Sequence, residues 1–114
     1  MRALDVLQKK IMTLDVRWED ENGNEKTAVF SPLMSKLASI IAELANSDYP
    51  CLRWIDNYGD TTYNQMQLTQ LADDLNRLRP RCPDDTTREH LEEILALVRK
   101  AAGETHTYVK FYGD

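Results

Sequence analysis

The chain has 114 residues, which is enough for one domain with a single hydrophobic core and too few for two ordinary domains. Hydrophobic residues make up 42% and charged residues 29%, a balance typical of folded globular proteins that excludes an intrinsically disordered chain. Its 14 basic residues against 19 acidic ones give a net charge of −5, and no segment forms a basic stripe, which argues against nucleic-acid binding.

Targeting and redox signals point to the cytoplasm. No apolar run approaches the roughly 18 residues that cross a bilayer, and Asp5, Lys9 and Lys10 interrupt the first segment where a signal peptide would be apolar. We therefore expect a cytoplasmic protein with no membrane association, in which both cysteines are reduced. Cys51 fits a small buried side chain, whereas Cys82 lies in a proline-flanked loop where a thiol can be exposed.

The first elements are a hairpin and a helix. Apolar and polar residues alternate from Met12 to Glu19, the period of a half-buried strand, and an Asn-Gly turn allows Glu25–Phe30 to return as its partner. Ser31 then predicts a helix N-cap and Pro32 a first-turn proline. The apolar residues at helical spacing are Leu33, Leu37, Ile40, Ile41 and Leu44, and the helix is expected to stop near Asn46 to Pro50.

A second hairpin is expected in the middle of the chain. Cys51–Asp56 predicts a strand with Leu52 and Trp54 on one face and Arg53 between them, followed by a turn at 57–60. Thr61–Met66 predicts the returning strand. Alternatively, Asn64 and Gln67 begin a helix with a capping box.

The last third of the chain predicts two helices and a strand. Leucines at helical spacing from Leu68 to Leu78 mark a helix that Pro80 and Pro83 terminate. Asp85 or Thr86 can cap the next helix, which ends at Gly103. Alternation over Thr105–Tyr112 predicts a closing strand.

These elements predict an α+β fold in the order ββαββααβ. Short connections favour an antiparallel sheet of about five strands, with three helices packed on one face. The other face is then solvated or covered by a partner. The side chains expected on that open face are Asp15, Arg17, Arg53, His106, Tyr108 and Lys110.

Catalytic and metal-binding patterns are missing from the sequence. His90 and His106 have no clustered ligands beside them, and there is no phosphate-binding glycine loop, nucleophile elbow or paired Cys and His. Asp56 and Asp60 flank a turn without the ligand spacing of a calcium loop, and capping of that turn explains them better. We predict no catalytic residues, no metal site and no cofactor.

The polar segment from residue 56 to residue 67 is the predicted contact region. It places carboxylates, amides, hydroxyls and aromatic rings around one glycine, and such groups are costly to fold unless each has a partner or stays in water. The predicted partner-binding residues are Asp56, Tyr58, Asp60, Tyr63, Asn64 and Gln67.

The same segment carries a family resemblance. The run Asp56-Asn57-Tyr58-Gly59-Asp60-Thr61, with Asn64 and Gln67 after it and a leucine-rich helix beyond, resembles a group of small uncharacterised bacterial proteins that share an Asp-x-Tyr-Gly-Asp-Thr turn and an Asn-x-x-Gln continuation. The resemblance covers roughly the second half of the chain and implies no activity. Small acidic proteins of this kind are similar to immunity proteins, which bind and neutralise a cognate toxin.

Three functions remain open from the sequence. The first is a protein-binding module, of immunity type, whose acidic surface meets a basic toxin domain. The second is a small-ligand or divalent-cation-binding protein centred on Asp56, Asp60 and Tyr63. The third is a structural homodimer subunit that associates through its open sheet face, so the chain is expected to be a monomer or a homodimer.

Overall fold

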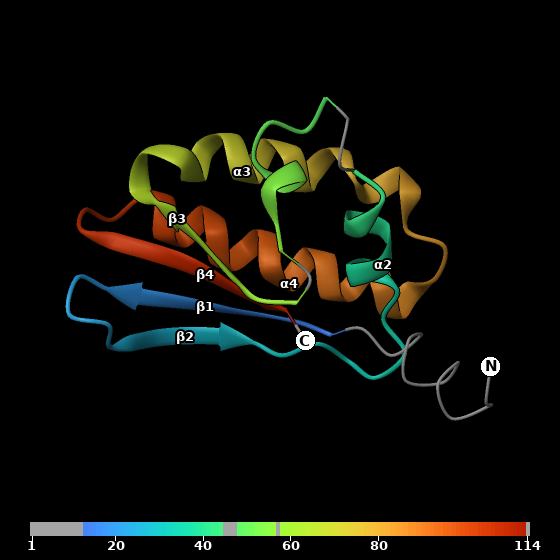
Figure 1. Cartoon of the computed structure of the whole chain (residues 1–114), viewed down its shortest axis with the longest axis horizontal. Helices are drawn as coiled ribbons and strands as arrows, with labels where there is room; N and C mark the ends of the chain where they lie inside the picture. The colour runs from blue at the N-terminus through green and yellow to red at the C-terminus, as the bar shows by residue number, and fades with distance from the viewer. Residues whose placement is uncertain (1–12, 45–47, 57, 114) are drawn as a thin grey trace.

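A four-stranded antiparallel sheet forms the centre of the molecule (Figure 1). The computed structural model describes residues 13–44, 48–56 and 58–113. The strands lie in the order β2-β1-β4-β3, and every neighbouring pair is antiparallel. Their bounds are β1 Leu14–Asp20, β2 Glu25–Val29, β3 Asp60–Asn64 and β4 Thr107–Gly113.

Two long helices cover one face of this sheet, and a short helix lies at the end where β1 begins (Figure 1). The short helix, α2, packs against α4 and against a 3-10 turn, η1. None of the helices in the described residues is long and apolar enough to cross a membrane. The bounds are α2 Leu37–Ala42, η1 Leu52–Trp54, α3 Gln65–Arg77, η2 Arg79–Arg81 and α4 Asp85–Ala102. The α+β class predicted from the sequence is confirmed.

The core lies between the sheet and the helices because inward side chains alternate along the strands. Val16 of β1 pairs with Phe111 of β4, and both side chains are fully buried. Tyr63 of β3 meets the Phe111 ring edge-on, with ring centroids 5.6 Å apart. Burial of each large apolar side chain stabilises the fold by about 1.5–3 kcal/mol.

The expected strand over Cys51–Asp56 is wrong, and the sheet has four strands where about five were expected. The segment instead forms η1, with Leu52 and Ile55 buried and Trp54 exposed. The cause is the carboxylate of Asp74, a fully buried residue of α3. Its Oδ2 accepts hydrogen bonds from the backbone N–H groups of Cys51 (2.7 Å) and Leu52 (3.1 Å), so these groups are not available to a strand ladder.

The first helix is shorter than predicted, because it begins at Leu37 and not at Ser31 or Pro32. Tertiary hydrogen bonds hold the preceding residues in another conformation. The N–H of Ser31 donates to Asp15 Oδ1 at 2.8 Å, and that of Lys36 donates to Thr87 Oγ1 at 3.0 Å. Leu33 is consequently exposed instead of lying on the predicted apolar face of the helix, and the neighbouring Met34 is exposed as well. The helix also ends earlier than predicted, because its last residue is Ala42. Asn46, near its expected end, and Met12, at the expected start of the first strand, lie outside the described residues.

The other helix boundaries follow their capping chemistry. Strand β3 ends at Asn64, and α3 begins at once with the capping box that Asn64 and Gln67 form, so the expected strand over Thr61–Met66 is too long at its end. Helix α4 is capped by Asp84, whose Oδ1 accepts from Thr87 N at 2.8 Å, and not by Asp85 or Thr86. The predicted end of that helix at Gly103 is confirmed.

The Asp74 carboxylate provides a test of what holds η1 in place. Replacing Asp74 with Ala leaves two buried backbone donors without an acceptor, so we expect the free energy of unfolding to fall by about 2–4 kcal/mol in urea titrations. Asp73→Ala is the matched control, because Asp73 is exposed on the same helix and should change stability by less than about 0.5 kcal/mol. Equal effects of the two substitutions would contradict this role of Asp74.

Candidate functional site

The turn before β3 is fixed by hydrogen bonds from its own side chains. Asp56 Oδ1 accepts from the N–H of Tyr58 at 2.9 Å, and the N–H of Asp56 donates to Thr61 Oγ1 at 2.9 Å. The N–H of Gly113, at the end of β4, donates to the carbonyl of Gly59 at 2.8 Å. The turn is therefore tied both to β3 and to β4, which gives its side chains a fixed support.

The Asp56 carboxylate packs directly against Gly59. A Cβ atom at residue 59 would lie 2.7 Å from Asp56 Oδ2, so any other residue there would require this carboxylate to shift. The carboxylate folds back over the glycine to reach the N–H of Tyr58. Asp56 therefore has a structural role in this turn in addition to its charge.

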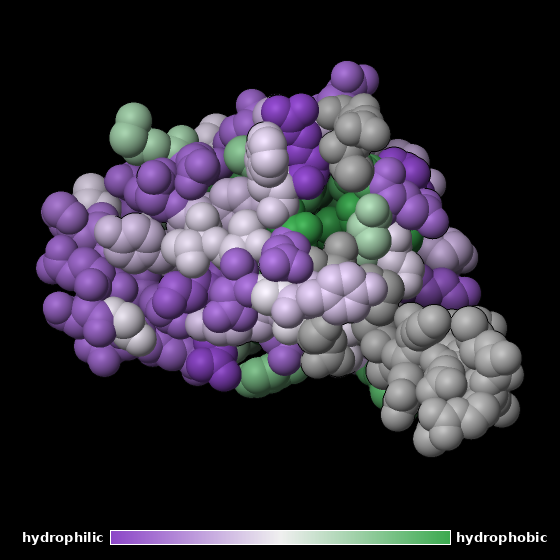
Figure 2. Space-filling model, in the orientation of Figure 1, coloured by the Kyte–Doolittle hydropathy of each residue, from purple (hydrophilic) through white to green (hydrophobic). Residues whose placement is uncertain are grey.

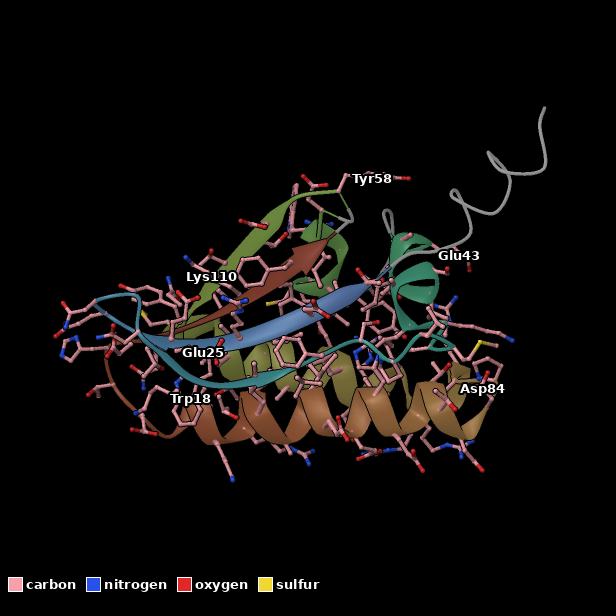
Figure 3. The ribbon with its side chains drawn as sticks, turned by 90° about the horizontal axis from the view of Figure 1, so that it is seen from below. Trp18, Glu25, Glu43, Tyr58, Asp84 and Lys110 are labelled. Atoms are coloured by element: carbon pink, nitrogen blue, oxygen red, sulfur yellow. The ribbon has the colours of Figure 1, made fainter. Side chains whose placement is uncertain are left out.

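An exposed aromatic ring between two carboxylates distinguishes this turn. The side chain of Tyr58 is 81% exposed and projects from the side of the sheet opposite α4 (Figure 3). Asp56 and Asp60 on either side of it are also exposed. Neither carboxylate forms an ion pair with a Lys or Arg in the part of the chain that the structure describes. We refer to Asp56, Tyr58 and Asp60 as the Tyr58 surface.

A second exposed aromatic residue precedes the turn. Trp54 of η1 is 66% exposed, and the Arg53 guanidinium lies over its ring, 4.9 Å from the centroid. Such a large exposed ring is an unusual feature beside a well-packed segment, because large aromatic side chains usually bury their area. Trp54 was predicted from sequence to lie in a strand, so its exposure became evident only from the fold.

The other three predicted contact residues lie elsewhere. Tyr63 points into the core, where its hydroxyl donates to the Cys51 carbonyl at 2.6 Å and burial raises the pKa of the phenol. Asn64 and Gln67 are exposed but form the α3 capping box, in which Gln67 Oε1 accepts from the N–H of Asn64 at 2.9 Å. They lie at the far end of β3, about 13 Å from Asp60 at the usual rise per strand residue. The structure therefore keeps Asp56, Tyr58 and Asp60 together and separates them from these three.

The open face of the sheet continues from the Tyr58 surface. The strand register places Asp60 of β3, Tyr112 of β4 and Asp15 of β1 in one row across the sheet. Figure 2 shows that the visible surface over the strands is mostly hydrophilic. Of the residues expected on this face, Arg53 and His106 lie outside the strands, because Arg53 belongs to η1 and His106 to the turn before β4.

Glu19 and Tyr112 form the central contact of the open face. Neither was among the residues predicted to lie on that face. Glu19 is 6% exposed, and its carboxylate accepts from the Tyr112 hydroxyl at 2.9 Å and lies 3.3 Å from the Lys110 ammonium. The Arg17 guanidinium covers the Tyr112 ring at 5.1 Å. Because alternate residues of a strand share a face, the sequence of β4 already placed Tyr112 on the same face as Lys110. Tyr112 could therefore have been predicted from the sequence. These charges neutralise one another within the sheet.

The chemistry available to the other ionisable groups is limited by burial. Both thiols are buried, and burial raises the pKa of Cys51 and of Cys82, which keeps them protonated at neutral pH. The exposed thiol envisaged for Cys82 is therefore wrong. Across the described ranges, no group of three or more His, Cys, Asp or Glu side chains is placed to hold a metal ion.

His90 is a buried structural residue. Its Nε2–H donates to the Leu14 carbonyl at 3.2 Å, which leaves Nδ1 to accept from the Ser35 hydroxyl at 2.7 Å. Burial lowers the pKa of the imidazole, although the bond to Leu14 opposes this. His106 is exposed, and its Nδ1 lies 3.7 Å from Glu21 Oε2. His90 therefore holds residue 35 against β1 instead of presenting a ligand to solvent.

The buried imidazole makes stability depend on pH in a defined window. Because the folded-state pKa of His90 is lowered, the unfolded chain binds a proton below about pH 6.5 that the native protein does not. Stability contributed by neutral His90 is therefore present above that pH and is lost as the pH falls. We expect a decline of at most about 1.4 kcal/mol per pH unit between about pH 6.5 and pH 5 in urea titrations.

Two variants isolate this effect. His90→Gln should lack the decline whatever its absolute stability, whereas His106→Gln should keep it because His106 is exposed. Three carboxyl groups with a lowered pKa also contribute stability, but this contribution is lost only below about pH 4.5. They belong to Asp20, Asp84 and Glu92. A decline that persists in His90→Gln would show that another group is responsible.

Comparison of the chain with protein-family models, with curated proteins and with solved structures finds no match. The geometry of the Tyr58 surface is therefore the basis for a functional proposal.

Proposed function

We propose that this protein is a small acidic protein-binding module, and within that class an immunity-type protein that neutralises a cognate bacterial toxin. The observation that carries the proposal is the Tyr58 surface: an aromatic ring, 81% exposed, between two carboxylates that form no ion pair with any described residue, on a turn that is tied to two strands. The resemblance of residues 56–67 to small bacterial proteins of immunity-like character supports the same class.

The rigid support of Tyr58 favours recognition. Tyrosine is enriched among the residues that dominate binding energy at protein interfaces, because it supplies a large amphipathic contact area with few rotatable bonds. Two hydrogen bonds, from the Tyr58 N–H to Asp56 Oδ1 and from the Asp56 N–H to Thr61 Oγ1, fix the backbone of the turn before any partner arrives. Little conformational entropy is therefore lost in this turn on association.

The charge of the surface favours a basic protein partner. Asp56 and Asp60 are exposed and carry no ion pair within the described ranges, and the whole chain has a net charge of −5. A basic protein surface would form ion pairs with these carboxylates and would be attracted to the chain at long range. A nucleic acid would be repelled by the same carboxylates.

Affinity capture from the native host, with identification of the bound protein by mass spectrometry, tests the proposal. We expect the wild-type chain to retain a basic protein that stops growth when produced alone, and co-production of the chain to restore growth. Tyr58→Ala should weaken binding of that protein about tenfold or more, because it removes an exposed aromatic anchor without disturbing the core.

Met66→Ala is the matched control for this variant. Met66 is 91% exposed but lies beyond the far end of β3, so its substitution should leave the affinity unchanged. Asp56 is unsuitable as a probe because its carboxylate also shapes the turn. Absence of any retained protein, or equal affinities of wild type and Tyr58→Ala, would refute the proposal.

A further inference from the structure

Strand β2 forms one edge of the sheet, and its lysine does not cover the backbone groups of that edge. Within the described part of the chain, β2 pairs only with β1, so the backbone groups on its other side have no strand neighbour. Proteins often guard such an edge with a lysine. Here Lys26 turns away from the edge, because its ammonium lies 2.8 Å from Glu104 Oε1 and 4.7 Å from the centroid of the Trp18 ring.

A hollow of about 310 Å³ follows this edge and separates it from α4. Strand β2 contributes Thr27, Ala28 and Val29 to its lining, and α4 contributes the buried Leu97 together with Glu93, Ala96 and Lys100. The last three form its outer rim. The middle of the hollow is thus apolar and its two ends are charged. On α4 these three residues follow at i, i+3 and i+7, which places them in one stripe along the helix. All three are exposed.

The stripe is complementary to a second copy of itself. We propose that two copies of this chain associate through β2 and α4 about a two-fold axis, with their β2 strands paired antiparallel. An axis through the region of Ala96 brings Glu93 of one copy opposite Lys100 of the other, and the symmetry forms this ion pair twice. Alanine at the centre lets the two helices approach closely.

The charged residues of α4 and the middle of β2 require the same position of the two-fold axis. Neither Glu93 nor Lys100 forms an ion pair within the described ranges, so both charges are available to a second copy. Because Thr27 and Ala28 line the same hollow as Ala96, the middle of β2 and the middle of the α4 stripe lie side by side. One axis can therefore pass through both, which a two-fold dimer with paired strands and packed helices requires.

This interface is independent of the proposed partner-binding site. Strand β3, which follows the Tyr58 surface, lies at the opposite edge of the sheet from β2. A second copy on β2 therefore leaves Tyr58 exposed. Five strand residues and one helix stripe make a small contact area, so the dimer should dissociate on dilution.

Charge reversal tests the pairing directly. Sedimentation velocity of the full chain at about 100 μM should give twice the chain mass of 13.2 kDa, and dilution should return the monomer. Glu93→Lys and Lys100→Glu should each weaken self-association about tenfold or more, because each places like charges opposite one another twice. An equimolar mixture of these two variants should recover the dimer, since every facing pair is then of opposite sign.

Two further variants separate this contact from general charge effects. Arg99→Glu is the matched control, because Arg99 makes the same change of charge on the same helix but lines a hollow with Thr69, Ala72 and Asp73 on the α3 side. It should leave the dimer intact. Ala96→Arg should abolish the dimer through bulk at the axis, while circular dichroism shows an unchanged fold.

Three results would each overturn the inference. A wild-type chain that stays monomeric at about 100 μM excludes the dimer. A dimer that survives Ala96→Arg uses a different surface. A mixture of Glu93→Lys and Lys100→Glu that stays monomeric shows that the two residues do not face each other.

Discussion

The buried carboxylate of Asp74 is the constraint on which the middle of this protein depends. It accepts the backbone N–H groups of Cys51 and Leu52, and Gln70 Nε2 donates to its second oxygen at 2.9 Å. Together with the bond from the Tyr63 hydroxyl to the Cys51 carbonyl, this holds η1 against α3 and β3. The chain leaves η1 in a fixed direction, which places the turn that carries Tyr58 beside the end of β4. A polar side chain buried in the core thus helps to orient an exposed loop.

The sequence predicted the fold class because most elements show a strong local period. The alternation in β1 and β4 and the helical spacing in α3 and α4 agree with how these segments are buried, and the Asn-Gly turn joins β1 to β2 as expected. The errors fall where a distant side chain takes over backbone groups. Asp74 prevents a strand at Cys51–Asp56, and Asp15 and Thr87 bind the amides of residues 31 and 36 where a helix was expected. No local pattern reports such long-range bonds.

The candidate site was likewise predicted only where local sequence determines the structure. Asp56, Tyr58 and Asp60 are exposed together because the turn chemistry that revealed them is local. Tyr63, the fourth residue of β3, faces the core, and strand alternation could have shown that it lies on the opposite face from Asp60 and Thr62. On the open face, Glu19 and Tyr112 form contacts across strands distant in sequence, and these needed the register of the sheet. Because the charged groups at the centre of the face pair with one another, we expect a partner to bind at an edge of the sheet.

The strand order β2-β1-β4-β3 has a consequence for valency. Because β2 and β3 are the two opposite edges, a pair of chains joined at β2 displays its two Tyr58 turns at the outer ends of one continuous sheet. A partner that is itself a dimer, with sites at a matching distance, would bind the second turn as an intramolecular event at high effective concentration. Avidity would then depend on the width of the continuous sheet, a quantity set by the four strands of each copy at a spacing of about 4.8 Å and by no residue of the contact surface.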